Sequence, residues 1–367
     1  MKLLHLSDLH IGKSIGSYSL LEDQKFCLDQ ILKIIEDEKV DIVLIAGDIF
    51  DTSIPNNEAM KVYSDFVDEI IFNLKKKIIA ISGNHDSGKR LEISKSFFEK
   101  NSYYIYGNSS DEKISFDDEY GKVNFYPIPY ISLARAKNEI DSNIENFTDL
   151  YKVLLKNIDY KGRNVLITHC YANEKPYEDE KIEGEKPLTI GGNDAMDAHL
   201  FKNFDYVALG HLHRKHFVLD EKIRYCGTFM KYSFSEINQK KSVTVIDLKE
   251  DLKIKEIEIK PLNDFEKICD YFENILKMEN SNAYIEFTLK DDKPIDSPMA
   301  KLKMKFPHAV SIKYEKSINI EKDEDIDIDF EKLSSLEIFE EFYKFKMNEK
   351  MTDLEKEILK KVIQWSQ

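Results

Sequence analysis

The chain has 367 residues, 42% of them hydrophobic with 22 Phe and 19 Tyr, and a formal net charge of −15. This length and composition predict two or three domains with a full hydrophobic core. No apolar run approaches the ~20 residues that span a bilayer, no signal peptide is visible, and the four Cys form no Cys-x-x-Cys pair, so we expect a cytoplasmic protein with reduced thiols and no membrane contact.

Short apolar runs, rich in β-branched residues, recur along the first two thirds of the chain. They occupy residues 3–6, 42–46, 78–82, 165–168 and 206–209. Such uninterrupted runs predict buried strands of a sheet that is covered on both faces. Helical apolar spacing is found in residues 22–38 and 59–74, and strands of a second sheet layer are expected at residues 223–226, 243–248 and 254–259. The predicted fold class is therefore α/β.

A polar motif follows each of the five buried strands. The motifs are Asp8-Leu9-His10, Gly47-Asp48-Ile49-Phe50-Asp51, Gly83-Asn84-His85-Asp86, Thr168-His169-Cys170 and Gly210-His211-Leu212-His213. Because α/β folds bind ligands outside the carboxyl ends of their strands, we expect these motifs to meet at one rim. The spacing of Asp8 and His10 places both side chains on one side of an extended chain. Glycines in three of the motifs allow the backbone to turn sharply beside the site.

The residue types in these motifs suit a pair of divalent metal ions. Together they offer carboxylate, amide and imidazole ligands, a mixture that binds Mn²⁺, Fe²⁺ or Zn²⁺. The residues alone do not choose among these ions. Two such ions held close together form a phosphoryl-transfer site.

The order of the motifs resembles that of the calcineurin-like binuclear metallophosphoesterases. Residues 1–12, 46–52, 224–228 and 233–236 narrow the resemblance to the bacterial SbcD type of nuclease. The resemblance implies a four-layer α-β-β-α sandwich over residues 1–260, then a small α/β capping domain for DNA and a C-terminal helix pair. Asp51 and Thr52 differ from the residues at these positions in related eukaryotic nucleases and protein phosphatases, which favours the bacterial type.

The resemblance also implies a role for each polar residue. One metal would be held by Asp8, His10, Asp48 and His213, and the other by Asp48, Asn84, His169 and His211. Asp48 would bridge the two ions. His85 would face the scissile phosphate as a catalytic residue and assist the leaving oxygen, while Asp51 would orient the His85 ring. A hydroxide activated by the two metals would attack the phosphorus.

The activity implied by the resemblance is that of a Mn²⁺-dependent DNA nuclease. Such a nuclease would act as an exonuclease on duplex ends and as an endonuclease on single strands and hairpins, in DNA repair and recombination. Its partners would be DNA, an SMC-like ATPase and a second copy of the chain, which the wide apolar face of residues 59–74 would contact. Packing of this face into the chain's own core is the alternative. Two alternatives remain: a small-molecule or cyclic-nucleotide phosphodiesterase of the same fold, and a silent scaffold, which the complete set of ligands disfavours.

The last third of the chain shows a change of composition. Residues 261–320 have the pattern of a small α/β unit, with helices at 265–276 and 298–306 and strands at 283–289 and 309–314. Residues 321–334 form an acidic linker. Residues 335–367 contain two amphipathic helices, at 335–348 and 352–365, that the resemblance assigns to the ATPase partner; packing against the chain's own body is the alternative.

The negative charge of the chain opposes contact with nucleic acid, but it is unevenly distributed. Residues 321–331 alone hold seven carboxylates and one Lys. Candidate DNA-backbone contacts are basic clusters outside this segment: Lys301, Lys303, Lys305, Lys313, Lys316, residues 75–77, and Lys89 with Arg90. Each cluster taken singly is equally consistent with a solvated surface.

Overall fold

The structure is a computed structural model that describes residues 1–108, 113–174, 195–249 and 251–315, together with residues 340, 343, 351, 352, 355, 356 and 359. The chain divides into two compact units, Met1–Glu315 and Lys316–Gln367. Within the described residues, no helix has both the length and the apolar character needed to cross a membrane.

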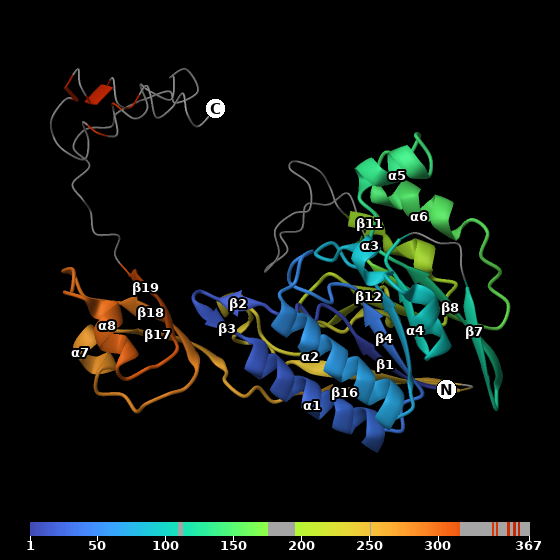
Figure 1. Cartoon of the computed structure of the whole chain (residues 1–367), viewed down its shortest axis with the longest axis horizontal. Coiled ribbons are helices and arrows are strands. Elements are labelled where there is room, and N and C mark those ends of the chain that lie inside the picture. The colour runs from blue at the N-terminus through green and yellow to red at the C-terminus, as the bar shows by residue number, and fades with distance from the viewer. Residues whose placement is uncertain are drawn as a thin grey trace. The chain divides into compact units, whose positions relative to one another are not determined.

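Two six-stranded sheets form the centre of the first unit (Figure 1). The first sheet has the order β16 (Leu252–Glu258), β15 (Ser242–Leu248), β1 (Lys2–Leu6), β4 (Ile42–Ala46), β5 (Lys77–Ile81) and β6 (Tyr103–Tyr106). The second has the order β13 (His216–Val218), β14 (Asp220–Tyr225), β12 (Tyr206–Gly210), β9 (Arg163–His169), β8 (Gly121–Ile128) and β7 (Ile114–Asp118). Strands β1, β4, β5 and β6 are parallel, as are β8, β9, β12 and β14. All five buried strands predicted from the sequence are present.

Helices cover the outer faces of both sheets and complete the four layers. The first sheet is covered by α1 (Leu21–Asp37) and α2 (Asn57–Asp68), which continues as a π-helix over Glu69–Asn73, and the second by α5 (Leu133–Glu139) and α6 (Phe147–Leu155). The remaining short helices are α3 (Gly88–Leu91), α4 (Lys95–Lys100) and the 3₁₀ turns Ala198–Phe201 and Phe234–Glu236. The α-β-β-α sandwich is therefore confirmed.

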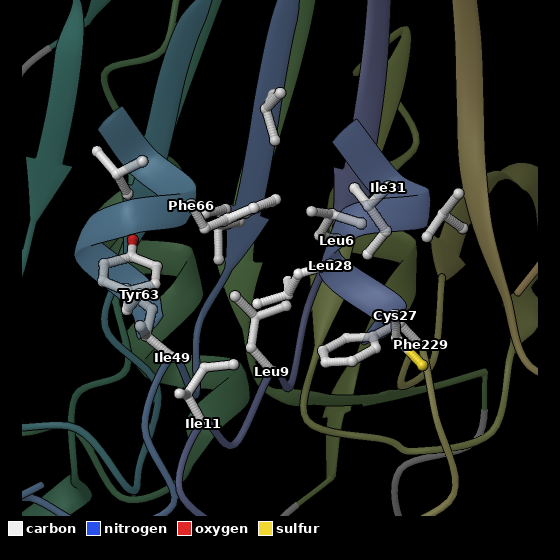
Figure 2. Close-up of a cluster of buried hydrophobic side chains, with 14 of the residues drawn as sticks. Leu6, Leu9, Ile11, Cys27, Leu28, Ile31, Ile49, Tyr63, Phe66 and Phe229 are labelled. Atoms are coloured by element: carbon white, nitrogen blue, oxygen red, sulfur yellow. The ribbon is translucent and has the colours of Figure 1, made fainter. Parts of the chain in front are cut away.

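Alternating faces of the strands explain the layers. Leu4, Leu6 and Val43 pack toward α1 and α2, whereas Leu3 and Leu44 pack against the second sheet. A strand buried on both faces needs apolar residues at every position, which is why the sequence shows continuous apolar runs. Figure 2 shows the outer core, with Cys27, Leu28 and Ile31 of α1 and Tyr63 and Phe66 of α2.

One part of the predicted sheet arrangement is wrong. Strands β15 and β16 were expected in the second layer, but they join the first sheet, with β15 antiparallel to β1 and β16 antiparallel to β15. Only β14, of the three later strands, lies in the second sheet. Apolar alternation shows that a face is buried but does not show which sheet supplies the neighbouring strand.

A three-stranded parallel sheet follows the sandwich. It contains β17 (Phe265–Asp270), β18 (Tyr284–Leu289) and β19 (Ala309–Tyr314), with helices α7 (Phe272–Ile275) and α8 (Pro298–Lys303). The helix predicted at 265–276 is wrong for its first half, because pairing with β18 holds Phe265–Asp270 extended. The other predicted elements of this small α/β unit are confirmed.

The small sheet is joined to the sandwich by a short hairpin and by the first turn of α1. In the hairpin, formed by β2 (Ser14–Ile15) and β3 (Tyr18–Ser19), the Tyr18 hydroxyl donates to the carbonyl of Pro307 at 2.9 Å. On α1, the buried Asp23 accepts hydrogen bonds from the Asn263 backbone N–H at 3.0 Å and from the Tyr284 hydroxyl at 2.8 Å. The segments that contact the small sheet, the β2–β3 hairpin and the start of α1, therefore directly follow the Asp8-Leu9-His10 motif in the chain.

Few residues of the second unit are described. Glu340 and Tyr343 are helical, as are Glu355, Lys356 and Leu359, at positions where two helices were predicted. The Tyr343 hydroxyl donates to Glu355 at 2.9 Å, and Lys356 pairs with Glu340 at 3.0 Å, so the two helical segments contact each other. The acidic linker predicted at 321–334, and most of the two predicted helices, lie outside the described residues.

Candidate metal centre

The carboxyl ends of β1, β4, β5, β9 and β12 bring all five polar motifs to one rim. Apolar neighbours hold the motif loops in place: Leu9, Ile11 and Ile49 point into the core under α1 and α2 (Figure 2). Asp8 and His10, which alternate with these anchors along the chain, are also buried. Backbone bonds from Asp8 N–H to the Gly47 carbonyl (3.0 Å) and from His10 N–H to the Asp48 carbonyl (2.9 Å) join the first two loops.

The backbone at the site is not extended, which corrects the expectation for the first motif. Asp8, His10 and Asp48 have φ values of 52°, 42° and 50°, and His211 has 113°. Non-glycine residues rarely adopt such angles, and they concentrate at functional sites where the surrounding structure holds them. The left-handed turns, rather than strand alternation, direct these side chains toward one another.

Close approach of the backbone explains the glycines of the motifs. Gly47 has a φ of +87°, so it does make the expected sharp turn. At Gly210 the requirement is space: a Cβ there would lie 1.8 Å from the Ala46 carbonyl oxygen and 2.7 Å from His169 Nδ1. Any side chain at this position would displace a predicted ligand.

Three predicted ligands of the first metal form one cluster. Ligand atoms of Asp8, His10 and His213 all lie within 4.8 Å of one another. His10 Nε2 and His213 Nε2 are 3.2 Å apart. Both oxygens of Asp8 also accept the His211 backbone N–H, at 3.0 and 3.1 Å, which fixes the carboxylate beside the fifth motif.

The predicted ligands of the second metal form an adjoining cluster. His169 Nε2 lies 2.9 Å from Asn84 Oδ1 and 3.4 Å from Asp48 Oδ2, and His211 Nδ1 lies 3.3 Å from the same Asn84 oxygen. Asp48 Oδ2 is also 3.8 Å from His10 Nε2, so this one oxygen lies between the two clusters. The other oxygen, Oδ1, accepts the His85 backbone N–H at 2.8 Å.

Hydrogen bonds behind the rings show that the clusters suit cations. His169 Nδ1 lies 2.9 Å from the Ala46 carbonyl, and His213 Nδ1 lies 3.2 Å from Glu236 Oε1, so each Nδ1 carries a hydrogen and Nε2 is the nitrogen left to face a metal. His10 differs, because its buried Nδ1 lies 3.4 Å from Asp51 Oδ1 without forming a hydrogen bond. The Nε2 atoms of His10 and His213 lie 3.2 Å apart, close enough for one cation to bind both.

The electrostatics of the buried groups agree with this fit. Burial alone would lower the pKa of His169, but the carboxylates of Asp48 and Asp8 raise the pKa to about 10. The same negative potential attracts a divalent cation. Oxygen and imidazole donors in this number match the ligands that Mn²⁺, Fe²⁺ and Zn²⁺ accept.

His85 and Asp51, the predicted catalytic pair, lie beside the first cluster. His85 is exposed, and its ring centroid is 4.8 Å from that of His10. Its Nδ1 lies 2.9 Å from the backbone carbonyl of Asp51, not from the carboxylate. The Asp51 carboxylate instead contacts Lys13 Nζ at 2.7 Å and faces His10. Asp51 thus contacts the His85 ring as expected, but through its main chain.

Several residues that support the site were given no role from the sequence. Asp86, in the third motif, accepts backbone N–H groups of Gly83, Ile49 and Phe50 at 2.9–3.0 Å and so joins two ligand loops. Burial and the Asp48 carboxylate raise the pKa of Asp86 to about 6.

Glu236 is the second such residue, and it belongs to the 233–236 string already noted. Its carboxylate contacts His213 Nδ1 and forms an ion pair with the buried Lys241 at 2.5 Å. Burial would raise the pKa of Glu236, but the bonds to His213 and Lys241 lower it to about 2. The one sequence signal for this role is that Glu236 lies within residues 233–236, and no spacing rule links that position to His213.

Comparison with known protein families shows which family the chain belongs to. Residues 1–215 match the family described as calcineurin-like phosphoesterase, and residues 257–347 match the one described as type 5 capsule protein repressor C-terminal domain. The SbcD protein of the nuclease SbcCD from Staphylococcus epidermidis is 33% identical over 377 aligned positions, covering 99% of this chain and 98% of that protein. The chain belongs to the SbcD family of calcineurin-like phosphoesterases. As an SbcD family member, it is a hydrolase of phosphodiester bonds.

Solved structures of low sequence identity also resemble the chain. GAP50, the anchor in the inner membrane complex of Plasmodium, is 12% identical with a TM-score of 0.42, covering 70% of this chain and 84% of that one. A dimetal phosphatase from Danio rerio is 12% identical with a TM-score of 0.42, covering 71% of this chain and 98% of that one.

Proposed function

We propose that this SbcD family member is a Mn²⁺-dependent DNA nuclease. It would degrade duplex ends as an exonuclease and cut single strands and hairpins as an endonuclease, in DNA repair and recombination. The observation that carries the proposal is the position of Asp48 Oδ2 between two clusters of acceptor atoms, with the exposed His85 beside them. The name of the Staphylococcus relative, part of a nuclease, supports DNA as the substrate.

The ligand assignment follows the two clusters. Asp8, His10 and His213 would hold one divalent ion, and Asn84, His169 and His211 the other, with Asp48 shared between them. When bound, two such ions would polarise the phosphodiester and make a nucleophilic water more acidic. The buried carboxylates of Asp8 and Asp48 would offset the mutual repulsion of the cations.

His85 would act on the substrate directly. Its Nδ1–H donates to the Asp51 carbonyl, which sets the ring orientation and leaves Nε2 for the substrate. In this position the ring would hold a proton for the leaving oxygen at Nε2. The backbone N–H of His85 is bonded to Asp48, so the catalytic ring and the shared ligand are positioned together.

The proposed partner is an SMC-like ATPase, together with a second copy of this chain. The relative's name describes one member of a nuclease complex, which supports a partner protein. The contact would be made by the predicted helices at 335–348 and 352–365. A homodimer through residues 59–74 is proposed from Met60 and Phe72, which stay exposed while the rest of the apolar face packs into the core.

Cleavage assays test the nuclease proposal. Wild type and Asp48→Ala would be incubated in Mn²⁺ with a labelled DNA hairpin, a blunt duplex and a chromophoric phosphodiester. We expect metal-dependent DNA cutting by the wild type and none by the variant. If the small ester is hydrolysed while DNA survives even after the ATPase partner is added, a small-molecule phosphodiesterase is the better assignment. Hydrolysis of neither substrate would indicate the scaffold.

A further inference from the structure

A polar pocket of about 370 Å³ lies at the same rim as the metal centre. It is lined by residues that follow β12 and β14, among them His213 and Thr228, and by residues that lead into β15, up to its first residue Ser242. Strands β12 and β14 are parallel to β9, so their carboxyl ends share the rim of the motifs. Because β15 runs antiparallel to β1, its first residue, Ser242, reaches that rim as well.

The pocket adjoins the first metal cluster through His213. The His213 carbonyl accepts hydrogen bonds from Lys241 Nζ at 3.0 Å and from the Thr228 backbone N–H at 3.1 Å, and both of these residues line the pocket. The ring of His213 meanwhile faces His10. A single residue therefore separates the pocket from the predicted metal.

The pocket carries uncompensated positive charge. Four cationic side chains line it, but Lys241 pairs with Glu236 at 2.5 Å and Lys215 pairs with Glu256 at 2.6 Å. Arg214 and Lys240 are exposed and form no ion pair with any residue that the structure describes. These two cations thus flank a cavity whose other lysines are balanced by glutamates.

The lining favours a phosphate over a base. Hydroxyl and amide groups make up much of the wall: Thr228, Ser235, Asn238, Gln239 and Ser242. Apart from His213, whose ring is directed at His10, none of the described lining residues is aromatic. Stacking of a base requires an aromatic surface, whereas phosphate oxygens are bound by cations and polar hydrogen-bond donors.

We propose that this pocket binds a backbone phosphate of the nucleic-acid strand, beside the phosphate that is cleaved. Arg214 and Lys240 supply the charge, and the hydroxyl and amide groups supply hydrogen bonds. This subsite selects a polynucleotide over a small phosphodiester, which has no second phosphate to place there. The inference rests on the proposed nuclease function and names how its substrate class is recognised.

The double variant Arg214→Ala/Lys240→Ala tests the subsite. With metal-free protein, binding of a fluorescent single-stranded oligonucleotide would be measured by anisotropy over a salt series. With Mn²⁺-loaded protein, hydrolysis of DNA and of a chromophoric phosphodiester would be measured. We expect DNA affinity to fall about tenfold and the slope of log affinity against log salt to decrease by ~0.7, because one phosphate contact to a single strand is lost. The small ester should be hydrolysed at the wild-type rate.

The matched control removes the same charge from the opposite rim. Lys122 and Lys253 are exposed, form no ion pair with the described residues, and lie at the starts of β8 and β16, far along the strands from their carboxyl ends. Lys122→Ala/Lys253→Ala should bind and cleave DNA nearly as wild type does. An equal loss in both double variants would show a general charge effect and overturn the subsite.

Other outcomes separate the two proposals. Unchanged DNA binding in Arg214→Ala/Lys240→Ala would contradict the subsite while leaving the nuclease intact. An equal loss on DNA and on the small ester would show a disturbed metal centre and also contradict it. If the wild-type protein binds DNA but does not cut it, the proposed nuclease function is contradicted, and the anisotropy series still tests the phosphate subsite. If the wild-type protein does not bind DNA, both proposals are contradicted.

Discussion

At the scale of single residues, the groups bonded to Nδ1 of two histidines set which nitrogen of each ring faces the candidate metal centre. The Ala46 carbonyl and Glu236 lie within hydrogen-bond distance of Nδ1 of His169 and His213 respectively. Each contact places the hydrogen on Nδ1 and leaves Nε2 as a donor of electrons to a metal. The groups behind the rings therefore matter as much as the ligands themselves.

Glu236→Gln should weaken metal binding. The amide would no longer neutralise the buried Lys241 or increase the basicity of His213, so we expect Mn²⁺ affinity to fall about 10- to 100-fold by calorimetry. Glu256→Gln is the matched control, because Glu256 also pairs with two cations, Lys215 and Arg224, but contacts no predicted ligand. Equal losses in the two variants would argue against a specific role for Glu236.

His85→Leu should separate catalysis from metal binding. The ring is exposed and belongs to the predicted proton-transfer step, so its loss should reduce single-turnover DNA cleavage by roughly 10²–10⁴-fold. Calorimetry with Mn²⁺ should still detect two ions, because no predicted ligand is removed. Loss of both ions in this variant would refute the catalytic assignment.

At the scale of elements, the first turn of α1 joins the small C-terminal sheet to the loop that carries the predicted ligand His10. Asp23 accepts hydrogen bonds from Asn263 and Tyr284 of the small α/β unit. The next residue, Gln24, is fully buried, and its Nε2 donates to the His10 carbonyl at 2.7 Å while its Oε1 accepts the Gly12 N–H at 2.9 Å. Two adjacent residues thus contact both parts of the molecule.

Gln24→Ala should loosen the His10 loop. It leaves buried backbone groups without partners, so we expect the free energy of unfolding to fall by about 1–3 kcal/mol in urea titrations, together with a lower Mn²⁺ affinity. Gln30→Ala, on the same helix, removes a similar bond to the Lys260 carbonyl, 2.8 Å long, away from the ligands. Gln30→Ala should leave Mn²⁺ affinity unchanged; a fall equal to that of Gln24→Ala would count against the loop-positioning role.

At the scale of the whole molecule, an ion-pair cluster ties the two sheets together at the rim opposite the site. Asp118 of β7 contacts Arg163 of β9 and the terminal ammonium group of Met1, at 2.5 and 2.6 Å. Arg163 also donates to the Leu248 carbonyl of β15 in the other sheet. The cluster therefore joins strands of both layers without contacting the metal centre.

Asp118→Asn should change how stability depends on pH. Arg163 and the Met1 ammonium group hold the pKa of Asp118 well below its usual value. A lowered pKa in the folded state contributes stability that is complete above the unfolded value of about 3.9 and is lost as the pH falls below it. The difference in unfolding free energy between wild type and variant should therefore be largest near pH 7 and shrink by pH 3. A difference that stays constant over this range would contradict the ion-pair explanation.

The small C-terminal sheet shows where local pattern misleads. Phe265, Ile268, Phe272 and Ile275 have helical spacing, which predicts a helix at 265–276. Phe265–Asp270 instead pairs with Tyr284–Leu289 and forms an edge strand. The helical spacing of its apolar residues therefore does not correspond to a helix there. Pairing between two segments that are separated along the chain is not visible in either segment alone.

The sequence by itself determined the five buried strands, the rim at which their motifs meet and the residue types of the metal centre, because burial on two faces demands continuous apolar runs and metal ligands demand particular side chains. Only the tertiary structure decided which sheet β15 and β16 join, that Asp51 contacts His85 through its carbonyl, and that Gln24, Asp86, Glu236 and Lys241 support the predicted ligands or their loops. These supporting hydrogen bonds join residues that are distant in the chain, such as Asp8 and His211. The order of residues along the sequence does not show which distant positions pair.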